Sequence, residues 1–147
     1  MKLAITGKGG VGKTTLSALL AQAYADAGRQ VLAVDADPSP CLAGALGFPP
    51  ELRAKLHPIA EMDALIEERT GAKPGTMGGF FTLNPRVDDI PERFSVTHQG
   101  VRLLEMGSVD MGGSGCICPE SAMLKTLFTH LLFRKDDVLI LDMYAGV

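Results

Sequence analysis

The feature that most constrains this chain is a glycine-rich segment near its N-terminus, residues 7–15 (GKGGVGKTT). An apolar run at residues 2–6 precedes it and is typical of a buried parallel strand. Apolar residues at helical spacing follow it (Leu16, Leu19, Leu20, Tyr24 and Ala27), with Gly28 where a C-terminal cap is expected. A second apolar run at 30–35 completes a strand–loop–helix–strand unit with a right-handed crossover.

The glycine-rich segment matches the pattern G-x-x-x-x-G-K-[ST] at Gly7, Gly12, Lys13 and Thr14. Glycines let successive backbone N–H groups turn toward phosphate oxygens, and a helix N-terminus adds partial positive charge. Lys13 is expected to reach the β- and γ-phosphates, and the Thr14 hydroxyl to bind Mg²⁺. The residues expected to bind the nucleotide are Gly9, Gly10, Val11, Gly12, Lys13, Thr14 and Thr15. A strand before and a helix after the segment disfavour a glycine turn with a chance lysine.

Carboxylates follow two of the apolar runs. Asp35 and Asp37 end the second strand, and Asp142 follows the most hydrophobic run, residues 137–141. Carboxyl ends of parallel strands face the ligand edge of a sheet. Asp142 fits the position that holds the hydration shell of Mg²⁺, with a strand-ending turn as the alternative. For Asp35, a helix-capping role remains as plausible as a role in the site.

Other patterns complete an α/β fold of the three-layer P-loop NTPase type with a mostly parallel sheet. The spacing predicts a helix over 61–70 closed by Gly71, loops over 71–79 and 84–91, and a strand over 101–106. Pro119 is expected to open a helix of about 16 residues with an apolar face. That face comprises Met123, Leu124, Leu127, Phe128, Leu131 and Leu132.

Composition limits the class of protein. The 147 residues are 46% hydrophobic and 21% charged, with a net charge of −3, as expected for one soluble domain over 1–147. The sequence has no long run of Lys and Arg, so we expect neither a nucleic acid nor an anionic membrane as partner. No apolar run approaches a membrane span, and no signal peptide is recognisable, so a cytoplasmic protein is expected.

Two of the three cysteines are close together. Cys116 and Cys118 lie just before Pro119, where a helix N-terminus would favour the thiolate, the metal-binding form. Two thiolates are too few for a tetrahedral metal site, but a two-fold dimer would supply the same pair again. Redox-active or buried thiols remain the alternative from spacing alone. Cys41 has no partner spacing and is predicted to be a small buried hydrophobe.

The second lysine of the loop, Lys8, makes the segment resemble the deviant Walker A group of dimeric ATPases. This group includes the cell-division and plasmid-partition (MinD/ParA) ATPases, arsenite pump ATPases and the nitrogenase iron protein. The resemblance implies that Lys8 reaches the nucleotide of the partner protomer, the alternative being a solvated surface lysine. It also implies that Asp37 orients the attacking water and contacts Mg²⁺ through water, and that Gly146 is a switch glycine.

A closer resemblance covers nearly the whole chain. The deviant loop, residues 115–120 (GCICPE), 83–91 (LNPRVDDIP) and 142–146 (DMYAG) together resemble the carbon monoxide dehydrogenase accessory ATPases, which insert nickel. This implies an ATP-dependent homodimer that holds Ni²⁺ or Zn²⁺ between two Cys116–Cys118 pairs. ATP hydrolysis, using Lys8, Lys13, Asp37 and Asp142, would release nickel to the carbon monoxide dehydrogenase apo-enzyme.

Two departures from this pattern keep other functions open. Tyr144 stands where the accessory ATPases usually have glutamate, and the chain ends five residues after Asp142, where those proteins continue. The expectation is therefore the N-terminal portion of a longer protein. Alternatives are an iron–sulfur protein that donates electrons, a positioning ATPase of the MinD/ParA kind, and an inactive fragment that binds phosphate weakly.

Overall fold

The computed structural model describes residues 1–76, 79–107, 118–135 and 138–144. Within these residues, five strands form one sheet in the order β1-β5-β2-β4-β3. The strands are β1 (Lys2–Ile5), β2 (Val31–Ala36), β3 (Val96–His98), β4 (Val101–Glu105) and β5 (Val138–Met143). β1, β5, β2 and β4 run parallel, and β3 pairs antiparallel with β4 at the edge. The predicted mostly parallel sheet is confirmed.

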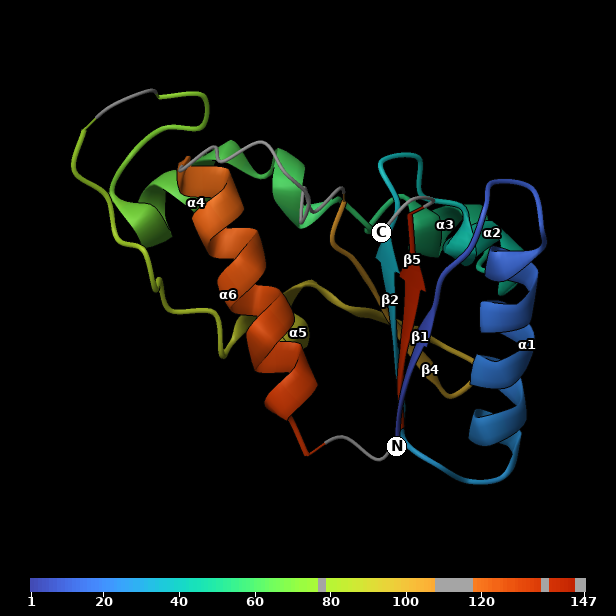
Figure 1. The fold of residues 1–147 in the computed structure, drawn as a ribbon. Coiled ribbons are helices and arrows are strands. Elements are labelled where there is room, and N and C mark those ends of the chain that lie inside the picture. Colours follow the sequence, from blue (N-terminus) through green and yellow to red (C-terminus); the bar gives the residue numbers. More distant parts are fainter. Residues whose placement is uncertain (77–78, 108–117, 136–137, 145–147) are drawn as a thin grey trace.

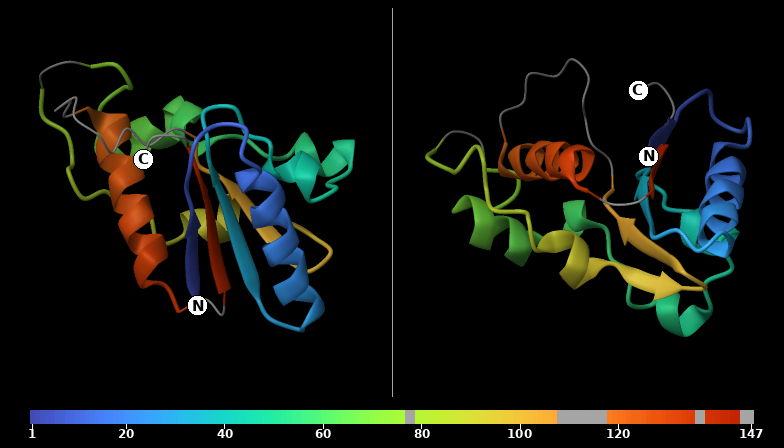
Figure 2. Two further views of the ribbon diagram at one scale, coloured as in Figure 1. Left: turned by 45° about the vertical axis from the view of Figure 1, so that its right-hand side comes forward. Right: turned by 90° about the horizontal axis from the view of Figure 1, so that it is seen from below.

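Helices cover both faces of this sheet, as the three-layer prediction requires (Figures 1 and 2). One face carries α1 (Lys13–Asp26), α2 (Leu42–Ala45) and α3 (Pro50–Arg53). The other carries the short 3-10 helix η1 (Ile59–Glu61), α4 (Asp63–Thr70), α5 (Ile90–Phe94) and α6 (Pro119–Phe133). Both α1 and α6 begin at the edge of the sheet where the parallel strands end (Figure 1). No helix in the described ranges is long and apolar enough to cross a membrane.

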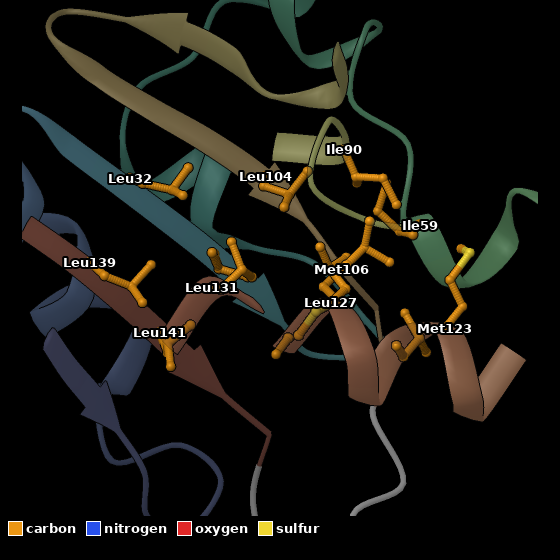
Figure 3. Packing of buried hydrophobic residues seen from close by; sticks show 14 of the residues in the cluster. Leu32, Ile59, Ile90, Leu104, Met106, Met123, Leu127, Leu131, Leu139 and Leu141 are labelled. Carbon is orange, nitrogen blue, oxygen red and sulfur yellow. The ribbon is translucent and has the colours of Figure 1, made fainter. Parts of the chain in front are cut away.

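Each face has its own hydrophobic core because successive strand residues point to opposite sides. On the α6 face, side chains from β2, β4 and β5 meet helix residues, as Figure 3 shows. Its largest fully buried members are Leu32, Ile59, Ile66, Ile90, Leu104, Met106, Met123, Leu127, Leu131 and Leu139. On the α1 face, α1 contributes the small residues Ala18 and Ala21, and larger side chains such as Phe48 come from other segments.

Most predicted elements lie within two residues of the observed ones. The expected helix over 61–70 begins at Asp63 and ends at Thr70, and the left-handed backbone of Gly71 (φ 83°) caps it. The predicted loop over 84–91 is wrong at its end, because α5 begins at Ile90 and Pro91 fits its first turn. The predicted strand over 137–141 starts at Val138; Asp137 lies outside the described residues.

The apolar stripe of α1 faces the core only in part. Leu20 and Tyr24 pack against the core of this face, whereas Leu16 and Leu19 are 49% and 64% exposed. The helix instead buries Ser17, Ala18 and Ala21. The Ser17 hydroxyl is accommodated because it donates a hydrogen bond to the Lys13 carbonyl (2.9 Å) one turn earlier.

Candidate functional site

The glycine-rich loop connects β1 to the first turn of α1. Gly10 (φ 76°) and Gly12 (φ 94°) adopt left-handed backbone conformations that residues with a Cβ rarely take. Gly12 is the N-cap, so α1 starts at Lys13 with its free N–H groups toward the loop. The Lys13 ammonium donates a hydrogen bond to the Lys8 carbonyl (2.9 Å) across the loop. The conformation is that of a phosphate-binding loop.

A cavity of about 440 Å³ lies against this loop. It is lined by Gly9, Gly10, Gly12, Lys13, Thr14, Thr15, Asp37 and Tyr144. The sheet order explains the grouping, because β1, β5 and β2 are neighbours and their carboxyl ends lead to the loop, to Tyr144 and to Asp37. The structure thus brings together most of the predicted nucleotide-binding residues. Lys8 and Val11 are outside this lining and are exposed to solvent.

Asp35 and Asp37 have different roles in the segment after β2. The buried Asp35 carboxylate accepts hydrogen bonds from the backbone N–H groups of Asp37 (3.1 Å), Cys41 (3.0 Å) and Leu42 (2.9 Å). Asp37 is half-buried in the cavity wall, and its carboxylate accepts a hydrogen bond from the Ser39 N–H (2.8 Å). Asp35 therefore holds in place the loop that carries Asp37 and the start of α2.

A row of three buried carboxylates crosses the sheet at this edge. In the strand register, Asp35 pairs with Asp142 on one side and with Glu105 on the other. Burial raises the pKa of the Asp35 carboxyl, with Asp142 adding to the effect, although backbone hydrogen bonds oppose it. Burial also raises the pKa of Glu105, helped by the nearby Asp35. Three carboxyl side chains are therefore grouped at the edge of the sheet next to the phosphate loop, where burial disfavours the charged forms of Asp35 and Glu105.

The chemistry of these groups fits Mg²⁺. Oδ1 of Asp142 is buried and has no hydrogen-bond partner among the described residues, so the side chain has an unused acceptor. Mg²⁺ takes oxygen ligands and keeps several waters. The Thr14 hydroxyl would bind the ion directly, and Asp37 and Asp142 would bind its waters. Bound Mg²⁺ would offset negative charge on the phosphates.

The second predicted site lies at the N-terminus of α6. Cys118 is the N-cap of α6, is buried, and donates a hydrogen bond from Sγ to the Ser121 hydroxyl (3.0 Å). Beside it is a cavity of about 550 Å³ between α6 and residues 83–87. Cys116 and Gly146, both predicted site residues, lie outside the described residues. No group of three His, Cys, Asp or Glu side chains suited to a metal occurs in the described ranges.

Cys41 is exposed, so the prediction of a small buried hydrophobe is wrong. The Cys41 N–H donates a hydrogen bond to the Asp35 carboxylate, which fixes the backbone at this point. The Cys41 thiol donates a hydrogen bond to the Ser39 carbonyl (3.2 Å) and remains exposed. Glu105 and Tyr144 were not predicted as site residues. Both had a sequence signal, since each stands at or just after the end of an apolar strand, as Asp35 and Asp142 do.

With this geometry in view, comparison with known proteins defines the class. Residues 2–143 match the model of the family described as the CobQ/CobB/MinD/ParA nucleotide binding domain. The chain belongs to this family of P-loop nucleotide-binding ATPases, which confirms the class that the deviant loop predicted. Fold and family agree, and the domain extends over nearly all of the sequence.

Relatives refine this similarity. The chain is 52% identical over 147 residues to the carbon monoxide dehydrogenase accessory protein CooC of Rhodospirillum rubrum. It is 46% identical over 147 residues to an uncharacterized ATP-binding protein of Methanocaldococcus jannaschii. It covers 56% of each of these proteins, so it spans about half the length of the curated relatives it matches. The predicted resemblance to the accessory ATPases is thereby confirmed.

A solved structure supports the fold. The septum site-determining protein MinD of Pyrococcus horikoshii, in complex with Mg-ADP, superposes with a TM-score of 0.55 and 28% sequence identity. The match covers 100% of this chain and 51% of the MinD chain. The similar fold in that protein accompanies a bound magnesium nucleotide.

Proposed function

We propose that this chain is the nucleotide-binding part of an ATPase that inserts nickel into carbon monoxide dehydrogenase. The observation that carries the proposal is the 52% identity to CooC over all 147 residues. The MinD-like structure is less similar in sequence, at 28% identity, and so favours a positioning function less. The reaction is hydrolysis of ATP to ADP and phosphate, coupled to the release of a metal.

The cavity beside the phosphate loop supports the ATPase part of the proposal. Lys13 and the loop N–H groups hold the phosphates, and Thr14 binds Mg²⁺. Asp37, which lines the same cavity, orients the attacking water. Asp142 supplies its free carboxylate oxygen to the hydration shell of the ion. Together these groups position the reactants and offset the charge of the transition state.

Lys8 would act on the nucleotide of a second copy. It is exposed, and only its carbonyl is engaged by Lys13, which leaves the ammonium group at the surface of the loop. A cation that enters from a partner protomer stabilises phosphoryl transfer as an arginine finger does. The proposal therefore includes an ATP-dependent homodimer.

The cysteine pair would hold the metal between the two copies. Cys118 lies at the N-terminus of α6 and lines the cavity between α6 and residues 83–87. Cys116 and Cys118 from both protomers would provide four thiolates, a set that suits Zn²⁺ or Ni²⁺. Opening of the dimer after hydrolysis would release the ion to the apo-enzyme.

Nucleotide binding is tested with Lys13→Ala. Removal of the charged donor is expected to weaken Mg-ATP binding by about 10- to 100-fold, measured by isothermal titration calorimetry. Lys125→Ala, an exposed lysine on α6, is the matched control and should bind like the wild type. Equal affinity of the Lys13 variant and the wild type would refute the assigned nucleotide site.

Metal binding is tested by nickel content after chelation and reloading. The wild type is expected to hold about one ion per two chains, as a shared four-thiolate site requires. The double variant Cys116→Ser, Cys118→Ser should lose this ion, whereas Cys41→Ser should keep it, because Cys41 is exposed elsewhere. Unchanged nickel binding by the double variant would exclude the metal site and, with it, the nickel function.

A further inference from the structure

Tyr144 occupies a particular place in the wall of the phosphate cavity. It comes directly after β5, two residues from Asp142, and its side chain is 46% exposed. β5 lies between β1 and β2 in the sheet. Because Tyr144 follows β5, it lies between the phosphate loop, which follows β1, and Asp37, which follows β2.

This place corresponds to the terminal phosphate of a bound nucleotide. A phosphate loop holds the α- and β-phosphates with its N–H groups, and its lysine reaches the β- and γ-phosphates. The γ-phosphate then extends from Lys13 toward the residue that orients the attacking water, Asp37. Tyr144 lines the same cavity as both of these residues.

The charges around Tyr144 have both signs. Lys13 provides a positive charge in the lining and Asp37 a negative one, while buried Asp35 and Asp142 lie at the adjacent edge. A phenol can donate a hydrogen bond to a phosphate oxygen and adds no negative charge.

We infer that the Tyr144 hydroxyl donates a hydrogen bond to the γ-phosphate of ATP and so makes the site distinguish ATP from ADP. This inference rests on the proposed function, because it requires the cavity to bind ATP. Tyr144 acts as a specificity-determining residue. Since ADP lacks the phosphate that the hydroxyl contacts, the contact adds affinity for ATP alone.

The test is Tyr144→Phe, which removes only the hydroxyl. Affinity for the magnesium complex of a non-hydrolysable ATP analogue should fall about tenfold, while affinity for Mg-ADP stays within twofold of the wild type. The matched control is Tyr24→Phe, because the chain has two tyrosines. Tyr24 is on α1, contacts the Met1 sulfur, and lies about 16 Å along the helix from the loop.

Fluorescence gives a second readout that does not need the Tyr144 variant to fold. The chain has no tryptophan, so in Tyr24→Phe the single remaining tyrosine is Tyr144. Its emission should change with the ATP analogue and much less with ADP.

The outcomes separate this inference from the proposed function. Unchanged analogue affinity in Tyr144→Phe, or equal losses for analogue and ADP, overturns the γ-phosphate contact while nucleotide binding stands. An equal response of Tyr144 emission to analogue and ADP overturns it as well. Wild-type protein that binds neither nucleotide overturns the proposed function, and this inference with it.

Discussion

Helices α1 and α6 begin at the same edge of the sheet, yet they are built in different ways (Figure 1). α1 starts after Gly12, whose left-handed backbone turns the chain out of the phosphate loop. α6 starts after the extended Cys118 and has Pro119 in its first turn. One N-terminus faces a phosphate cavity and the other carries a thiol. Two helix N-termini at one end of the sheet thus carry different groups: glycine-loop N–H groups at α1 and a buried cysteine at α6.

The two helices also bury different kinds of residue. α6 buries Met123, Leu124, Leu127 and Leu131, the stripe that its sequence predicts. α1 buries small side chains and leaves two leucines in solvent. The comparison indicates that a hydrophobic stripe does not by itself set which face of α1 is buried. At α1, the phosphate loop sets where the helix begins and which way its N–H groups point, so rotation follows the loop.

The largest effect is expected on the α6 side. Leu127 is fully buried among strand and helix residues, and Leu127→Ala should lower the free energy of unfolding by about 2–5 kcal/mol through lost burial and a cavity. Urea denaturation measures the change. Leu132→Ala, at a 36% exposed position on the same helix, is the control and should cost much less. Equal losses would mean that the rotation of α6 is not as described.

An intermediate effect concerns the ion pair that supports the α6 layer. Arg69 on α4 donates hydrogen bonds to Asp89 from both terminal guanidinium nitrogens, Nη1 and Nη2 (2.6 and 2.7 Å). These bonds hold the pKa of Asp89 well below its usual range. Asp89→Asn should cost about 1–3 kcal/mol at pH 7, because it leaves the largely buried Arg69 side chain with only the exposed Glu68 as a carboxylate partner.

The same pair predicts a pH dependence with a definite sign. A carboxyl with a lowered folded-state pKa contributes stability above the pKa of the unfolded state, about 3.9, and loses it as the pH falls. Wild-type stability should therefore drop as the pH falls from about 5 toward about 2, more steeply than that of Asp89→Asn. Asp88→Asn, next to it but exposed, should follow the wild type more closely. Parallel profiles for wild type and Asp89→Asn would rule out this contribution.

The smallest effect is expected on the exposed side of α1. Leu19→Ala should change the free energy of unfolding by less than about 0.5 kcal/mol, because the side chain is 64% exposed and alanine is a better helix former. Ala21, two residues further along α1, is buried and gives the contrast. Ala21→Leu would overpack the core on the α1 face and lower the free energy of unfolding. A large loss in Leu19→Ala would show that this leucine is covered in solution.

Much of the fold was predictable from local pattern. The strands around Leu3, Val34 and Leu141 are short apolar runs between turn residues, and such runs are recognisable without tertiary information. The hairpin of β3 and β4 was not predicted, because its two-residue turn uses Gln99 (φ 48°) and Gly100 (φ 80°). Glutamine is a rare residue at such a position, where asparagine or glycine is the usual signal.

The site was predictable where chemistry depends on spacing along the chain. Gly12, Lys13 and Thr14 are adjacent, so their joint role follows from the motif. Tyr144 and Asp37 are more than one hundred residues apart, and only the order of the strands brings them into one cavity. Cys118 was correctly expected at a helix start, and its pairing with Cys116 across a dimer stays a prediction.

The sequence by itself determined the phosphate loop, the parallel sheet and the family, because glycine conformations and strand hydrophobicity are properties of adjacent residues. Only the tertiary structure decided that Asp35 anchors the loop of Asp37, that α1 packs through its alanines, and that Tyr144 stands beside Lys13. These facts depend on strand order and helix rotation, which are set by long-range packing. The carboxylate row of Glu105, Asp35 and Asp142 exists for the same reason: parallel register aligns the ends of strands that are distant in the chain.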